Sequence, residues 1–204
     1  VGARVSRLGR DLPDAPAGPA LPGAHQRDNA ALAVALARDA AAAVGVPLPV
    51  DVVERGLATV SWPGRLEHVG DVILDAAHNE EGAATLVAYL TSLSGARPPV
   101  AVVSIVGGKD ATAMLARLAS ALSAIVLTRS ANERSVPPAE LARVVPAATP
   151  VSIVEDPLVA LALARRLAAG APVLVTGSIF LVGQLRAALR GEAVDPVVTS
   201  DPMR

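Results

Sequence analysis

The chain has 204 residues, of which 52% are hydrophobic and 18% charged, so we expect one large or two small globular domains rather than a disordered chain. Eighteen basic residues against nineteen acidic ones leave no positive excess for nucleic acid phosphates or an anionic membrane, and neither partner is expected. The absence of cysteine excludes thiolate metal sites, disulfides and thiol catalysis, and three histidines argue against a histidine-rich metal site. No apolar run reaches the roughly 18 residues of a membrane span.

The first part of the chain has a helical pattern after an irregular start. Residues 1–24 contain four prolines among Gly, Ala and Asp, which predicts a tail or connector without regular structure. The Ala-rich segment 28–44 predicts a long helix, and a second, short helix is expected over residues 50–59. The helical pattern breaks soon afterwards, and we place a domain boundary near Ser61.

Beyond this boundary, five runs rich in β-branched residues alternate with Ala- and Leu-rich stretches. The runs are residues 72–75, 100–106, 124–128, 151–154 and 172–176. The helical stretches are residues 80–94, 110–122, 137–145, 156–169 and 178–190. Apolar runs without polar alternation are typical of strands buried on both faces. The sequence therefore predicts an α/β domain over residues 61–204, with a mainly parallel sheet covered by helices on both faces.

In open α/β sheets, ligands bind beyond the carboxyl ends of the strands. Three polar junctions of this kind follow predicted strands here. They are Asp75-Ala76-Ala77-His78-Asn79, Gly107-Gly108-Lys109-Asp110 and Thr176-Gly177-Ser178. Each precedes a predicted helix, whose N-terminus favours anions.

At the first junction, a carboxylate, an imidazole and a carboxamide share one short turn. Asp75 suits ribose hydroxyls, and His78 suits proton or phosphate contacts. Alternatively, Asp75 or Asn79 only caps the following helix.

The second junction contains Lys109, the only lysine of the chain. The Walker A spacing fails here, because position 103 is Val and position 110 is Asp. Lys109 can still bring a point charge to a phosphate; alternatively, Asp110 caps a helix and Lys109 is solvated. At the third junction Ser178 is a helix cap or an anion contact, since the G-x-S-x-G elbow of serine hydrolases is absent.

Two further residues have side chains suited to a nucleotide. Arg65 offers a fork of donors for phosphate, or it forms an ion pair with Glu67 or Asp71. The carboxamide of Asn29 can contact a purine edge, or Asp28 or Asn29 caps the first helix.

The order of these motifs resembles a known family. His25-Gln26 with Asn29, then Pro63-Gly64-Arg65-Leu66-Glu67, Leu74 to Asn79, Lys109-Asp110 and Thr176-Gly177-Ser178 resemble the C-terminal half of the Mur ligase superfamily. Within it, the similarity is to the folylpolyglutamate and dihydrofolate synthases, and it extends from about Leu21 to Leu189.

The resemblance implies an ATP-dependent amide ligase that adds L-glutamate to a folate or dihydropteroate carboxylate through an acyl phosphate. It implies ATP and Mg²⁺ as cofactors, with the metal ligands mainly in an N-terminal domain, and a cytoplasmic enzyme that is a monomer when complete. By similarity, Asn29 contacts adenine, Arg65 the nucleotide phosphates and Asp75 the ribose. His78 and Lys109 fall on catalytic positions, and His78 and Ser178 on substrate-binding ones.

The sequence departs from the family in two respects. Glu80-Glu81 stands where the family has Pro, which places negative charge near arriving anions. No G-x-x-x-x-G-K-S/T phosphate loop occurs, so we expect the C-terminal part of such an enzyme, inactive alone, with residues 1–60 from the tail of the central ATP-binding domain. Two alternatives stay open: a Mur ligase acting on a cell-wall nucleotide precursor, and a non-catalytic nucleotide-binding or interaction module.

Overall fold

The computed structural model describes residues 5–93 and 97–193. The chain divides into two compact units, residues 1–63 and residues 64–204. Because the positions of the two units relative to one another are not determined, we describe each by itself.

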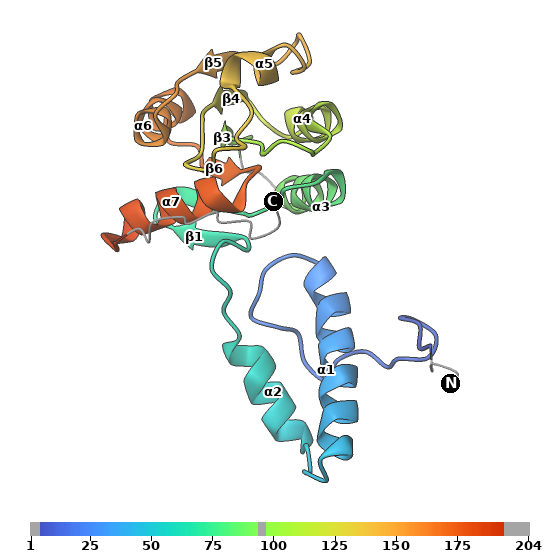
Figure 1. Ribbon diagram of the computed structural model, residues 1–204. Helices are drawn as coiled ribbons and strands as arrows, with labels where there is room; N and C mark the ends of the chain where they lie inside the picture. Colours follow the sequence, from blue (N-terminus) through green and yellow to red (C-terminus); the bar gives the residue numbers. More distant parts are fainter. Residues whose placement is uncertain (1–4, 94–96, 194–204) are drawn as a thin grey trace. The chain divides into compact units, whose positions relative to one another are not determined.

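The first unit contains the two helices that the sequence predicts, α1 (His25–Ala43) and α2 (Val50–Thr59), after an irregular segment (Figure 1). Helix α1 begins three residues earlier than expected, with Ala24 at its N-cap and no side-chain cap. The alternative role of Asp28 or Asn29 as the cap is therefore wrong, since both lie inside the helix. In the irregular segment, the Ala20 amide donates to the Leu57 carbonyl of α2 at 2.8 Å.

The second unit is built on a six-stranded sheet with the order β1-β2-β6-β3-β4-β5. The strands are β1 (Glu67–Val69), β2 (Val72–Leu74), β3 (Val100–Val103), β4 (Ala124–Leu127), β5 (Val151–Ile153) and β6 (Val173–Thr176). All neighbours pair in parallel except β1 and β2, which are antiparallel. The predicted mainly parallel α/β fold is confirmed, and β1 is the strand that the sequence pattern missed.

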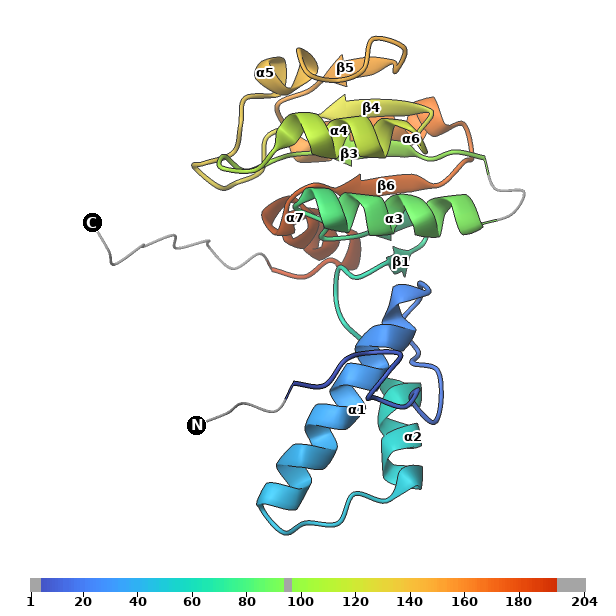
Figure 2. The ribbon, with the colours of Figure 1, turned by 90° about the vertical axis from the view of Figure 1, so that its right-hand side faces the viewer.

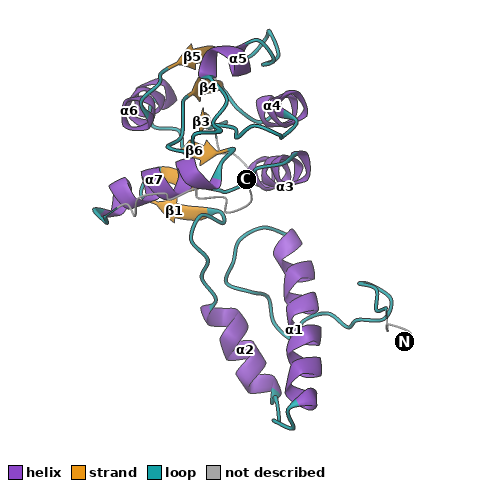
Figure 3. Cartoon of the chain, in the orientation of Figure 1, coloured by secondary structure: helices purple, strands orange, loops and turns teal. Residues whose placement is uncertain are grey.

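Helices cover both faces of this sheet (Figure 3). They are α3 (Glu80–Ser92), α4 (Ala111–Ala119), α5 (Pro138–Ala142), α6 (Pro157–Ala168) and α7 (Ile179–Arg190). Helices α3 and α4 pack side by side on one face, and α6 and α7 lie on the other. The end-on view of Figure 1 and the rotated view of Figure 2 agree on this three-layer arrangement.

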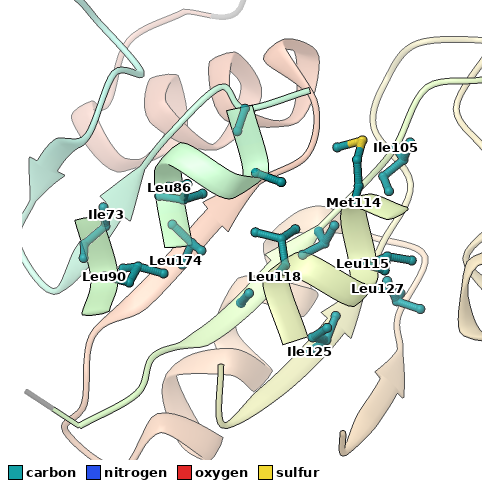
Figure 4. Packing of buried hydrophobic residues seen from close by; sticks show 14 of the residues in the cluster. Ile73, Leu86, Leu90, Ile105, Met114, Leu115, Leu118, Ile125, Leu127 and Leu174 are labelled. Atoms are coloured by element: carbon teal, nitrogen blue, oxygen red, sulfur yellow. The ribbon is translucent and has the colours of Figure 1, made fainter. Parts of the chain in front are cut away.

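Two hydrophobic clusters fill the spaces between the layers. On the α3–α4 face, Leu86 and Leu118 pack against Ile73, Leu174 and Ile125 of the sheet (Figure 4). The cores are aliphatic, as the scarcity of aromatic residues predicts. No helix in the described part of the chain is long and apolar enough to cross a membrane.

Candidate functional site

The carboxyl ends of four adjacent parallel strands meet at one edge of the sheet. The loops at this edge are residues 75–79 after β2, 177–178 after β6, 104–110 after β3 and 128–137 after β4. The Gly177 amide donates to the Ala77 carbonyl at 3.0 Å, and the Ser104 amide donates to the Thr176 carbonyl at 3.4 Å. The three predicted junctions therefore share one edge, and hydrogen bonds hold their backbones in place.

Asp75 connects the loop after β2 with the turn that precedes β1. Its Oδ1 accepts from the Ala77 amide and its Oδ2 from the Leu66 amide, both at 3.0 Å. The half-buried carboxylate therefore fixes two backbone segments. Carboxylate oxygens can only accept, so the hydrogen-bonding partners of Asp75 are donors such as amides and hydroxyls. The capping alternative holds for Asn79, whose Oδ1 accepts from the Gly82 amide at 2.8 Å at the start of α3.

His78 is exposed, and its ring is oriented by its own loop. Its Nδ1 lies 2.9 Å from the Ala76 carbonyl oxygen, which can only accept, so Nδ1 carries the hydrogen. In the neutral ring, Nε2 is then a hydrogen-bond acceptor, and it has no partner among the described residues.

The acidic pair that departs from the family pattern occupies the first turn of α3. Glu80 forms an exposed ion pair with Arg117 of α4 at 3.4 Å. Part of its charge is thereby balanced, and both carboxylates are favourable to the helix dipole.

Arg65 is exposed and makes no hydrogen bond or ion pair with any other described residue. The alternative ion pairs expected for it are wrong, because both candidate carboxylates are paired elsewhere. Asp71 binds Arg165 of α6 through two hydrogen bonds, of 2.8 and 3.0 Å. Glu67 binds arginines of α7. The guanidinium of Arg65 therefore remains available for a ligand.

Glu67 is the centre of an ion-pair network with Arg186 and Arg190. Arg186 Nε lies 2.9 and 3.1 Å from the two carboxylate oxygens, and Arg190 Nη2 lies 2.9 Å from Oε1. Burial acts to raise the pKa of Glu67, but the hydrogen bonds from the Gly64 amide and the two arginines outweigh it, so the pKa lies below its usual value. Sequence reasoning missed this network, whose members lie 119 and 123 residues apart.

Lys109 has the solvated arrangement considered as its alternative role. Its side chain is exposed with no described partner, and Asp110 caps α4 by accepting from the Ala113 amide at 2.9 Å. The loop that presents Lys109 is held by the loop after β4. The Gly107 amide donates to the Arg134 carbonyl at 2.8 Å, and Arg134 Nη2 donates to the Gly107 carbonyl at 3.2 Å.

Three buried serines reinforce this contact between the loops. Ser104 and Ser135 share a hydrogen bond of 3.0 Å between their hydroxyl oxygens, and both oxygens accept from the Ser130 amide. The sequence held a signal for this loop, because it follows a buried strand as the other three loops do. The sequence prediction included the other three junctions but not this one.

Ser178 is only 2% exposed and caps α7, its Oγ accepting from the Phe180 amide at 3.2 Å. The cap alternative is therefore realised. Asn29 belongs to the first unit, where its Nδ2 donates to the Gln26 Oε1 at 3.0 Å. The other five predicted site residues lie in loops of the second unit.

A metal ion is implied by the resemblance, but the described residues offer no group of three His, Asp or Glu side chains placed to hold one. The polar side chains at the carboxyl edge suit a different ligand. Two cations, a carboxylate and an imidazole fit an anion that also carries hydroxyl groups.

The fold and this edge place the second unit among the open α/β domains that bind ligands beyond the carboxyl ends of their strands. A family model described as Mur ligase, glutamate ligase domain matches residues 64–179, and the chain belongs to this family. The resemblance predicted from the ordered motifs is thereby confirmed.

Individual relatives agree with this assignment. The folylpolyglutamate synthase of Lacticaseibacillus casei is 31% identical over 179 residues, covering 84% of this chain and 40% of that protein. The dihydrofolate synthase/folylpolyglutamate synthase of Mycobacterium tuberculosis is 37% identical over 121 residues, covering 57% of this chain and 25% of that protein. A crystal structure of the Mycobacterium tuberculosis folylpolyglutamate synthase, complexed with ADP and AMPPCP, has a TM-score of 0.77 and 32% identity, covering 87% of this chain and 42% of that one. The chain thus spans less than half the length of these relatives.

Proposed function

We propose that this chain is the C-terminal part of an ATP-dependent folylpolyglutamate or dihydrofolate synthase, a cytoplasmic and monomeric enzyme when complete. It adds L-glutamate to a folate or dihydropteroate carboxylate through an acyl phosphate. The observation that carries the proposal is the unpaired Arg65, which lies one residue from a backbone amide held by Asp75. Membership of the glutamate ligase family supports it.

Residues 1–60 belong, in this proposal, to the tail of the central ATP-binding domain. The match to the Lacticaseibacillus casei enzyme supports this. It covers 84% of the chain, which is more than residues 64–204 alone, so it extends into the first unit. Asn29 of α1 then contacts the adenine. Activity requires the rest of that domain, so the 204-residue chain is inactive alone.

The chemistry is a phosphoryl transfer followed by an acyl transfer. The terminal phosphoryl group of ATP moves to the acceptor carboxylate, and the amine of glutamate then displaces phosphate to form the amide. Arg65 binds the nucleotide phosphates, where a fixed cation stabilises the charge that develops on the transferred group. Asp75 accepts hydrogen bonds from the ribose hydroxyls, as the resemblance implies.

Amide formation also releases a proton from the glutamate amine. His78 Nε2 is the open acceptor at this edge, since Nδ1 donates to the Ala76 carbonyl. Lys109 supplies a second cation for phosphoryl or carboxylate oxygens. Ser178 donates its hydroxyl hydrogen to a substrate oxygen while its own oxygen caps α7.

The proposal predicts that Arg65→Ala in the complete ligase raises the KM for ATP or lowers kcat by more than about tenfold, equivalent to about 1.4 kcal/mol or more. The measurement is ATP-dependent incorporation of glutamate into a folate acceptor. Arg166→Ala removes another exposed arginine, on α6, and is expected to leave both constants unchanged.

Each outcome of this assay is informative. Unchanged kinetics in Arg65→Ala contradict the role of Arg65. Turnover with a cell-wall nucleotide precursor in place of a folate favours the other branch of the family. A folded complete protein that binds no ATP favours a non-catalytic module.

A further inference from the structure

Hydrogen bonds fix the backbone on both sides of Arg65. On the N-terminal side, the Gly64 amide donates to Glu67 Oε2 at 2.8 Å, and the Gly64 carbonyl accepts from the Ala76 amide at 2.7 Å. On the C-terminal side, the Leu66 amide donates to Asp75 Oδ2 at 3.0 Å. The backbone of the turn is therefore fixed, while the side chain of Arg65 is exposed.

The turn also has an unfavourable local conformation. Gly64 has φ +68°, and a Cβ added there would lie 2.8 Å from Val182 Cγ1. Leu66 has φ +49°, a left-handed conformation that costs energy in a residue with a side chain, and it is only 2% exposed. Such a conformation persists only where the surrounding contacts enforce it. The Gly64 amide donates to the Glu67 carboxylate, which lies outside the loop after β2.

Glu67 is itself held in place by α7. Its side chain is 13% exposed, and Arg186 contacts both of its oxygens. Arg186 is oriented in turn by Glu192, whose Oε2 lies 2.9 Å from Nη1. Beside the Gly64 amide and Arg186, Arg190 is the third donor to the Glu67 carboxylate, but its side chain is more exposed than that of Arg186. Arg186 is thus the donor that fixes the rotamer of Glu67, with Oε2 directed to the Gly64 amide.

We propose that Arg186 is a positioning residue for Arg65. Through Glu67 it fixes the turn of residues 63–66, and so the direction in which the Arg65 guanidinium meets the phosphates of a nucleotide. The inference rests on the proposed function for the identity of the ligand. Arg186 is not expected to contact the nucleotide, because its Nε and Nη1 bind Glu67 and Glu192 and its side chain is 22% exposed.

A double-mutant cycle in the complete ligase tests this inference. Arg186→Ala is expected to raise the KM for ATP about fivefold to tenfold, because Arg65 is no longer held in its binding direction. In an Arg65→Ala background, the same substitution is expected to change that KM by less than twofold. Arg186→Lys is expected to recover part of the loss, since an ammonium keeps the positive charge beside Glu67 but cannot also bind Glu192 in the fixed geometry of a guanidinium.

The matched control is Arg165→Ala. Arg165 also binds a carboxylate through two hydrogen bonds, to Asp71, from the neighbouring helix α6. Its removal is expected to leave the KM for ATP within twofold of the unsubstituted enzyme. A purely structural role of Arg186 would lower the amount of folded enzyme without this selective change in KM.

The outcomes separate this inference from the proposed function. The inference is wrong if the unsubstituted enzyme turns over ATP and glutamate but Arg186→Ala leaves the KM for ATP unchanged. It is also wrong if Arg186→Ala raises that KM by the same factor with and without Arg65→Ala. If the unsubstituted enzyme has no such turnover, the proposed function fails instead. Amide hydrogen exchange in the 204-residue chain then tests directly whether Arg186 fixes the turn of residues 63–66. We expect at least tenfold faster exchange at Gly64 in Arg186→Ala than in Arg165→Ala, and equal rates would overturn the inference.

Discussion

At the scale of single residues, Gly177 is the position where the site depends most strictly on one residue type. It has φ +92°, and an added Cβ would lie 2.5 Å from the Ser104 carbonyl oxygen. Both observations exclude a side chain without movement of the backbone. The residue joins β6 to α7, and its amide bonds to Ala77, so any shift would reach the neighbouring loop.

Gly177→Ala is therefore expected to destabilise the chain by about 2 kcal/mol or more. Gly183→Ala is the matched control, because Gly183 lies inside α7 with nothing within 4 Å of an added Cβ. It is expected to stabilise the chain by about 0.5–1 kcal/mol, since alanine is the better helix former. Urea unfolding of both variants measures the difference. Equal stabilities would mean that the loop adapts to a side chain.

The sequence located the residues of the site better than it assigned their local contacts. Asp75, His78, Lys109 and Ser178 lie at strand ends, as the alternation of runs predicted. The ion pair expected for Arg65 was wrong because its two candidate partners bind arginines far along the chain. Neighbours in sequence can be listed from a sequence alone, whereas partners across a tertiary contact cannot.

At the scale of elements, β2, β3, β4 and β6 were predictable as buried strands because they are apolar on both faces, as a covered parallel sheet requires. The prediction that the fifth run is also buried was wrong, because β5 lies at the sheet edge, where Ile153 is exposed. Strand β1 was missed because it has three residues, an exposed histidine at its centre and an antiparallel place at the sheet edge. Such a strand carries no run of apolar residues. Beside its short pairing with β2, strand β1 is linked to α7 through the Glu67 carboxylate.

This link predicts a pH dependence of stability. The pKa of Glu67 is lower in the folded chain than in the unfolded one. Its contribution to the free energy of unfolding is therefore fully present at pH values above the pKa of the unfolded chain, and it is lost as the pH falls through the pKa of the folded chain. Glu67→Gln is expected to destabilise the chain by about 2 kcal/mol at pH 7, because two arginines lose a charged partner. Urea unfolding at pH 7 and near pH 3 should give a smaller difference between variant and parent at the lower pH. A difference that does not depend on pH would contradict the role of the ionised carboxylate.

At the scale of the whole molecule, the hydrophobic core belongs to the second unit. Both clusters are formed by residues from Leu66 onward, with none from the first unit among the described residues. The first unit buries little apolar surface in the described chain. Its buried helix residues are Gln26, Ala30, Ala31 and Val34 in α1 and Val53 in α2. The energy of burial is therefore concentrated beyond the boundary at residue 64.

We accordingly expect residues 64–193 to fold without residues 1–63, with a single cooperative urea transition followed by circular dichroism. A second fragment, residues 72–193, is the matched comparison. It lacks β1 and Glu67, so β2 becomes an edge strand and Arg186 loses the carboxylate that it binds. Its transition is expected at lower urea concentration, by an amount equivalent to at least about 2 kcal/mol. If residues 64–193 unfold without cooperativity while the 204-residue chain does not, the stability of the α/β unit depends on the first unit after all.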